Sequence, residues 1–264
     1  MMVWRYLRLA LVQARISAAA AMTYRADFLL EGVMAIAWMG LTLLPLIVLY
    51  NGRAEVAGWD RPAALIVIAY FMGLRGVLEG MVSPSLVDLV ERIRSGAFDY
   101  VLLKPVDAQA LVSASRFEPW KIFDVIGGIG LACYAFYLRG EPPALAHVAL
   151  GMLLFGCGVL AMYSLWIMCA AASFWVVRLD NLTYLLGAMF DTARWPVQVF
   201  RGLWRVVFTF VIPVAVMTTY PAMALLGKID AATALGVIAG CLGLLVVSRV
   251  VWRAAIRSYT SASS

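Results

Sequence analysis

The chain has 264 residues, of which 64% are hydrophobic and only 14% are charged, with a formal net charge of +6. A soluble domain is roughly half apolar and about a quarter charged, so this composition excludes a soluble enzyme or binding domain built around one core. The positive charge does not indicate nucleic-acid binding, because no basic patch gathers on a soluble surface. The composition therefore predicts an all-α polytopic membrane protein.

Residues 1–27 predict an amphipathic helix that lies in the membrane interface. Apolar and small residues recur there at helical spacing: Trp4, Leu7, Leu11, Ala14 and Ala18. Arginines interrupt this stretch too often for the apolar region of a signal peptide. The alternative is a plain cytoplasmic extension of the first span.

Six apolar blocks predict six transmembrane helices, since each span needs about 20 mostly apolar residues. In chain order the blocks cover residues 28–50, 62–82, 122–138, 145–177, 203–217 and 233–252. The fourth block is longer than one span requires, so we expect it to tilt or to project beyond the bilayer. The whole chain, 1–264, is expected to form a single transmembrane domain.

The basic residues predict the orientation of these spans. With a cytoplasmic N-terminus, 16 of the 21 Lys and Arg fall in inside segments, four fall outside and one lies within a span. Cytoplasmic loops retain Lys and Arg, and anionic lipids of the inner leaflet attract them. We therefore expect a multi-pass protein of the cytoplasmic (inner) membrane with both termini in the cytoplasm.

The second span carries two ionisable residues, Arg75 and Glu79. They are four residues apart on one helix face, so each can neutralise the other. An ionisable side chain inside the bilayer is costly and is often functional. Two interpretations stay open: a self-satisfying structural pair, or a pair that lines a substrate path or a dimer interface.

The longest connection, residues 83–121, is expected to be ordered, because a structureless loop of this length is uncommon. Apolar positions predict a helix that begins near Ser85 as its cap and contains the i,i+4 pair Asp88 and Arg92. Gly96 is expected to end this helix. We interpret the segment as a docking surface for a partner; the alternative is a charged helix lying on the membrane.

Catalytic, metal and nucleotide sites are not expected. The only histidine is His147, and the four cysteines have no metal-ligand spacing. No phosphate-binding loop motif occurs. The glycine-rich run at 127–130 lies in an apolar span, where small residues serve close helix packing.

A stretch within residues 83–121 resembles a known family. Residues 94–106 read R-S-G-A-F-D-Y-V-L-L-K-P-V, which is similar to the R-x-G-x-x-D-x-x-L-x-x-P-V motif of ABC-2 type transporter permeases of the small six-helix subfamily. Residues 194–196, 208–213 and 219–227 also resemble the fifth-span region of that subfamily. The order and spacing of these motifs make the resemblance specific, although each motif alone is short.

The resemblance implies the roles of several residues. The cytoplasmic helix after the second span would be a coupling helix that contacts an ATPase, with contact or shaping positions at Glu91, Arg92, Arg94, Gly96, Asp99, Leu103 and Pro105. A short re-entrant region before the last helix would be broken at Pro213, Pro221 and Gly227. The larger external domain found elsewhere in the family is not expected here.

The resemblance also implies the function: a permease subunit of an ATP-driven exporter that moves an amphipathic or hydrophobic substrate out of the cell. ATP and Mg would be bound by a separate ABC ATPase subunit, and this chain would bind no cofactor. A second permease, identical or related, and membrane lipids are the other expected partners. The alternatives are an ion-coupled secondary transporter, for which no inverted repeat is evident, and a non-transporting membrane scaffold.

Overall fold

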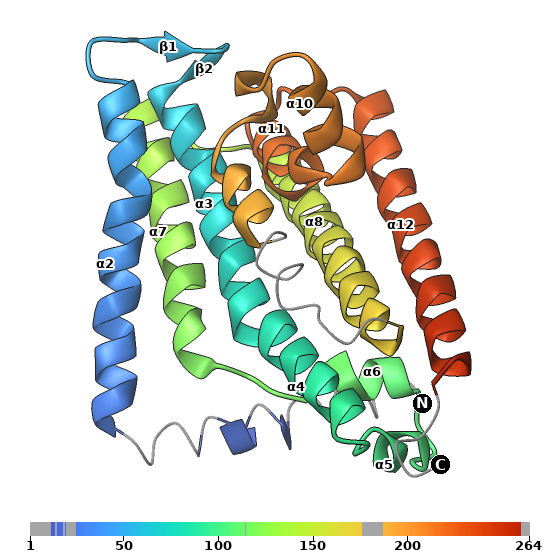
Figure 1. The fold of residues 1–264 in the computed structure, drawn as a ribbon. Coiled ribbons are helices and arrows are strands. Elements are labelled where there is room, and N and C mark those ends of the chain that lie inside the picture. The colour runs from blue at the N-terminus through green and yellow to red at the C-terminus, as the bar shows by residue number, and fades with distance from the viewer. Residues whose placement is uncertain are drawn as a thin grey trace.

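The computed structural model describes residues 12–13, 15–17, 19, 25–113, 115–175 and 187–259. Long helices stand side by side in a bundle with short helices at both ends (Figure 1). Within the described residues, five helices are long and apolar enough to cross a membrane. They are α2 (Arg25–Leu49), α3 (Arg61–Val77), which continues into α4 (Ser83–Arg94), α7 (Ile122–Arg139), α8 (Leu145–Ala171) and α12 (Ala231–Arg257).

One end of the bundle carries a β-hairpin between α2 and α3, and we call it the hairpin end. Strand β1 (Glu55–Val56) pairs antiparallel with β2 (Trp59–Asp60). The Asp60 side chain caps α3 by accepting a hydrogen bond from the backbone N of Ala63 at 3.0 Å. The indole of Trp59, almost fully buried, donates to Gln198 Oε1 at 3.2 Å. The hairpin is therefore fixed to distant parts of the chain.

The centre of the bundle is α3, which is buried along most of its length. It packs against α7 at very short range, because a Cβ added at Gly128 would lie 2.6 Å from the backbone oxygen of Ala69. A Cβ at Gly127 would meet the flexible end of the Met39 side chain, and Gly130 faces open space. The predicted role of this glycine run in close packing is therefore confirmed for Gly128.

Helix α3 does not stop where the second predicted span ends. A π-helical turn, Leu78–Val82, joins it to α4, giving 34 continuous helical residues. Pro84 has no N–H to donate to the carbonyl of Gly80 four residues earlier, and that carbonyl instead accepts from the backbone N of Glu118 at 2.8 Å. The prediction of Ser85 as a helix cap is wrong, because no helix begins there; the Ser85 hydroxyl donates to the backbone O of Arg116 at 2.9 Å.

The predicted fifth span, 203–217, is wrong as a continuous helix. It consists of short pieces: α10 (Leu203–Val206), then π-helical turns Val207–Val211 and Ala215–Thr219, followed by α11 (Tyr220–Leu225). The backbone of Met217 lies against Gly158, in the middle of α8. Pro213 lies between the two π-helical turns, where its missing N–H favours a break.

Within the described residues, five of the six predicted spans are long helices. Helices α8 and α12 lie side by side and run in the same direction (Figure 1), with Cys157 against Cys241. Two neighbouring helices that run parallel require the chain to return between them. The chain therefore returns toward the hairpin end between α8 and α12, without a long helix in the residues that the structure describes.

The other predicted spans match α2, α7, α8 and α12 to within a few residues, except that the end predicted for the fourth, residue 177, lies outside the described residues. The remaining short helices are α5 (Asp99–Leu102), α6 (Ala108–Ser113) and the 3-10 turns Pro119–Lys121, Ala172–Phe174, Asp191–Arg194 and Val197–Val199.

The predicted interfacial helix at residues 1–27 lies mostly outside the described residues. Its described pieces are helical, and Gln13 Nε2 donates to the backbone O of Ser115 at 2.6 Å.

Candidate functional site

The 83–121 segment forms a compact unit at the end of the bundle opposite the hairpin (Figure 1). Its first part is α4, where Arg92 Nε lies 2.7 Å from Asp88 Oδ2 as the spacing predicts. Gly96 ends the helical path with a φ of +75°, a conformation that favours glycine. The chain then turns sharply into α5 and α6, so both the predicted ion pair and the predicted end are confirmed.

Phe98 anchors this unit to the long helices. Its side chain is fully buried among three aromatic rings from the ends of α8 and α12. The ring centroids lie 5.4 Å from Phe174, 6.3 Å from Trp252 and 5.3 Å from Tyr259, all in edge-to-face arrangements. Such pairs add about 0.5–1.5 kcal/mol each beyond the burial of their surface. The unit is therefore packed directly against the ends of the membrane helices.

A polar network makes a second attachment. Arg249 of α12 donates to Asp107 Oδ1 at 3.1 Å and to Gln109 Oε1 at 2.6 Å, and its second amino group pairs with Asp107 Oδ2. Gln109 Nε2 in turn donates to the hydroxyl of Tyr163 on α8 at 3.0 Å, and Ser113 Oγ lies 2.7 Å from the same hydroxyl. The hydrogen bond from Arg249 is the main cause that lowers the pKa of Asp107.

The outer surface of the unit carries both exposed apolar side chains and exposed charged side chains. Leu103 is 79% exposed and Tyr100 is 71% exposed, although side chains of this size are usually covered. Glu91, Arg94 and Pro105 are also exposed. An exposed apolar patch rimmed by polar residues is typical of an interaction site.

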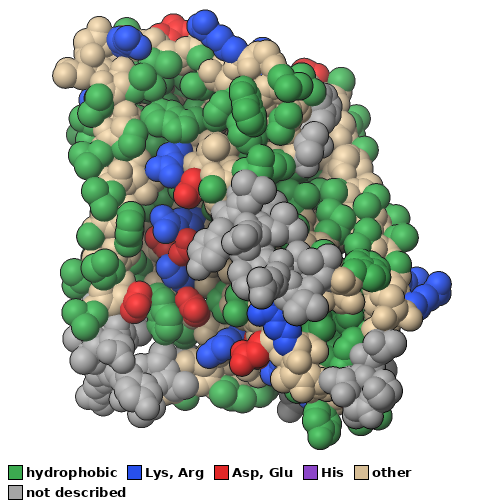
Figure 2. Space-filling model, viewed as in Figure 1, with side chains coloured by type: hydrophobic (Ala, Val, Ile, Leu, Met, Phe, Trp, Pro, Cys, Tyr) green, Lys and Arg blue, Asp and Glu red, His purple; other side chains and the backbone are tan. Residues whose placement is uncertain are grey.

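A second group of polar residues lies between the ends of the bundle. Glu79, on the π-helical turn, joins two cations: its Oε1 lies 2.8 Å from Arg75 Nε and its Oε2 lies 2.5 Å from Lys121 Nζ. Asp124, one turn along α7 from Lys121, is buried. We call these four residues the charged cluster. Figure 2 shows charged side chains in a band down an otherwise apolar face of the molecule.

The comparison with protein families decides the identity of the chain. The model described as "ABC-2 family transporter protein" matches residues 36–263, which include the 83–121 segment, the charged cluster and α12. The chain belongs to the ABC-2 transporter family. It is therefore a multi-pass membrane permease of an ABC transporter and the kind of protein that works with an ABC ATPase. Neither the curated proteins nor the solved structures contain a match.

The structure of this ABC-2 permease shows that the seven predicted contact positions differ in exposure and in the contacts that they make. Of the predicted contact positions, Glu91, Arg94, Leu103 and Pro105 lie on the surface. Arg92 is engaged by Asp88, Gly96 shapes the turn and Asp99 is half-buried at the start of α5. All seven positions belong to one unit, but only some of them face outward.

Arg75 and Glu79 form the predicted pair, and Lys121 joins it from the start of α7. Sequence reasoning missed this third member, because contact across 42 positions leaves no local pattern. It also missed Phe98 and the Arg249 network. The signal that could have found Arg249 is an arginine inside the last apolar span.

The predicted break in this permease extends from the middle of α8, where Met217 lies against Gly158, to the start of α8, where Gly227 lies against His147. Pro221 occupies the first turn of α11, and Gly227, with a φ of +67°, follows its end. Thr218 Oγ1 donates to the backbone O of Ala193 at 2.7 Å, and Thr219 Oγ1 accepts from the backbone N of Val197 at 3.1 Å. These side chains satisfy backbone groups of irregular segments, as broken helices inside a membrane protein require.

No group of three or more metal-binding side chains occurs among the described residues.

Proposed function

We propose that this chain is the membrane-spanning subunit of an ATP-driven exporter, which moves an amphipathic or hydrophobic substrate out of the cell. A separate ABC ATPase, which binds ATP and Mg, would dock on the 83–121 segment. One observation carries the proposal: the exposed side chains of Tyr100 and Leu103 belong to a unit that is fixed to α8 and α12. A surface built in this way can both bind a partner and transmit its movement.

Three connections would transmit that movement. Helix α4 continues into α3, Phe98 packs between the ends of α8 and α12, and Arg249 ties α12 to the loop before α6. When the ATPase closes around ATP, the 83–121 segment would move and the three long helices would follow. The change is driven because ATP binds one state of the ATPase more tightly than the other.

The orientation that we propose puts the 83–121 segment in the cytoplasm of a cell with an inner membrane. Basic residues support it, because Arg92, Arg94, Lys104 and Arg116 all belong to the unit at this end of the bundle. The last described residues, which follow α12, lie at the same end (Figure 1). Both termini would then be cytoplasmic.

The charged cluster supports a second permease chain, identical or related. Arg75 and Glu79 are 25% and 31% exposed, and charged atoms at this depth need cover from protein or water. Lipid provides neither. We propose that this face meets the second permease or lines the substrate path between the two chains.

The proposal is tested by purifying the tagged permease from its own cells with Leu103→Asp, and with Leu145→Asp as a matched control. Leu145 is 84% exposed at the start of α8, at the hairpin end. We expect an ABC ATPase, identified by its phosphate-binding loop, to accompany the wild-type and Leu145→Asp chains and to be absent with Leu103→Asp. Retention of the ATPase by Leu103→Asp would contradict this docking surface.

Transport by the purified chain without any ATPase would favour the ion-coupled secondary transporter instead. In that case the charged cluster would be the candidate ion site.

A further inference from the structure

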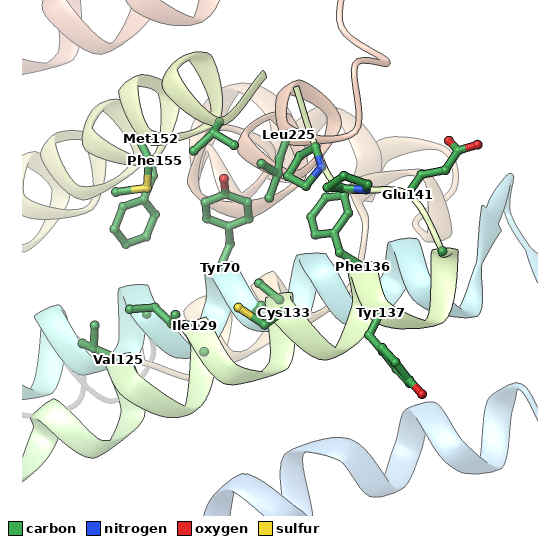
Figure 3. Close-up of a pocket in the computed structure, with 18 residues that line it drawn as sticks. Tyr70, Val125, Ile129, Cys133, Phe136, Tyr137, Glu141, Met152, Phe155 and Leu225 are labelled. Carbon is green, nitrogen blue, oxygen red and sulfur yellow. The ribbon is translucent and has the colours of Figure 1, made fainter. Parts of the chain in front are cut away.

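A cavity of about 780 Å³ lies between α3, α7 and α8 and reaches the hairpin end (Figure 3). Its walls are almost entirely apolar, with Phe136, Met152 and Phe155 among the lining residues. The ring of Tyr70 projects from α3 into the same space, with its centroid 5.6 Å from that of Phe155. A space of this size and lining is typical of a ligand site.

The cavity is long. On α7 its lining extends from Val125 to Gly140, which is roughly 22 Å at 1.5 Å per residue.

The cavity is open toward the surface that lipid would contact. Cys133 lines it and is exposed. The hairpin end of the cavity is formed by Gly140, Glu141 and the prolines that follow. Glu141 is the only charged residue in the described lining. A chain could therefore enter from the side, with a polar group left at this end.

Water is a poor occupant of this space. A buried water needs two to four polar partners, and the lining offers little besides the hydroxyl of Tyr70. One hydrocarbon chain matches the length, the apolar wall and the direction along the helices. The carboxylate of Glu141 at the polar end favours a headgroup with a positive charge and opposes an anionic one.

We propose that this cavity holds one acyl chain of a phospholipid from the surrounding bilayer, inserted from the leaflet at the hairpin end. The headgroup would carry an amine, as in phosphatidylethanolamine, and would lie beside Glu141. The site differs from the charged cluster and from the 83–121 segment, so it does not depend on the proposed export function.

The test measures phospholipid that stays with the detergent-purified chain, by native mass spectrometry after extensive washing. Ala132→Phe fills the cavity, and Ala239→Phe adds the same group to the exposed face of α12. We expect wild type and Ala239→Phe to retain about one phospholipid per chain, and Ala132→Phe to retain at least fivefold less. Equal retention by Ala132→Phe, or none by wild type, would overturn the proposal.

A second measurement uses wild-type protein and needs no folded variant. In delipidated samples, the alkylation rate of Cys133 is followed by peptide mass while phosphatidylethanolamine or phosphatidylglycerol is added. We expect phosphatidylethanolamine to slow the reaction of Cys133 at least fivefold and phosphatidylglycerol to slow it less, with Glu141→Gln reducing that difference. Equal rates of Cys133 alkylation with and without lipid would refute the site.

Neither readout involves ATP, an ATPase or transport. A negative result would therefore leave the proposed function standing, and a failure to find an ATPase would leave the lipid site standing.

Discussion

Arg249 and Asp107, 142 positions apart in the sequence, form a two-point ion pair that joins α12 to the 83–121 segment. Asp107 also accepts a hydrogen bond from the backbone N of Ala110 at 3.1 Å and so caps α6. One carboxylate therefore both shapes the segment and binds it to a membrane helix.

Replacing Arg249 with Gln should weaken this attachment. Hydrogen bonds to charged groups are worth about 1.5–3 kcal/mol. Water screens this ion pair, because both side chains are about one-third exposed. We therefore expect a loss of stability of about the size of one such bond. Thermal unfolding in detergent measures it. Arg253→Gln removes the same charge from an exposed position one turn later, and an equal decrease in Tm for both variants would contradict the prediction.

The same pair predicts a pH dependence. Because the hydrogen bond from Arg249 lowers the pKa of Asp107 in the folded protein, its stabilisation is present above the unfolded pKa of about 3.9. It is lost as the pH falls through the lower, folded value. We expect the Tm of wild type to fall more steeply below pH 4 than that of Asp107→Asn. Parallel curves for the two proteins would show that Asp107 contributes nothing.

Phe98→Ala should separate folding from surface recognition. Removing a buried phenyl ring costs about 3–5 kcal/mol, and here it also removes contacts with Phe174, Trp252 and Tyr259. We expect a large decrease in Tm. Tyr100→Ala, at a 71% exposed position close by, should leave Tm unchanged, since its ring is not part of this aromatic group; a comparable decrease there would argue against an anchoring role specific to Phe98.

Glu79→Gln should impair export and leave assembly with the ATPase intact, if the charged cluster belongs to the pathway. The change leaves Arg75 and Lys121 without their shared carboxylate, which also lowers stability. Adding Lys121→Met restores the charge balance. We expect the double variant to recover Tm but not ATP-driven transport in vesicles, whereas recovery of both would identify the cluster as purely structural.

Gly128→Ala should disturb the contact between α3 and α7. A Cβ there would lie 2.6 Å from the backbone oxygen of Ala69, and overpacking of this kind costs about 1–3 kcal/mol. Gly130→Ala, two residues away, meets nothing within 4 Å. Circular dichroism melts should show a decrease in Tm for the first variant and no decrease for the second.

The long helices could be predicted from the sequence because their signal is local. The run at 122–138 is continuous and apolar, and the structure ends it at Gly140 in a left-handed conformation. Gly96 is likewise recognisable as an end, since its neighbours favour a helix and it does not. In both cases the glycine that ends the helix lies within two residues of its last residue.

The sequence predictions were wrong where the same local pattern is compatible with two structures. Residues 203–217 are as apolar as a span, but Pro213 and the buried threonines that follow favour short pieces bonded to residues near 193–197. Ser85 looks like a cap, yet Gly80 finds a substitute donor in Glu118, so the helix continues past Pro84. The partners of Phe98 and Arg249 could not be predicted, because they lie far away in the sequence.

The continuous helix from Arg61 to Arg94 has a mechanical consequence. Its 34 residues span roughly 51 Å, about 20 Å more than the hydrocarbon layer. Glu118 and Lys121 contact this helix near Gly80. This contact point lies about 21 Å from the Arg94 end of the helix and about 28 Å from the Arg61 end. If this helix tilted as one rod about that point, a displacement of about 3 Å at Arg94 would move the end beside the hairpin by about 4 Å in the opposite direction.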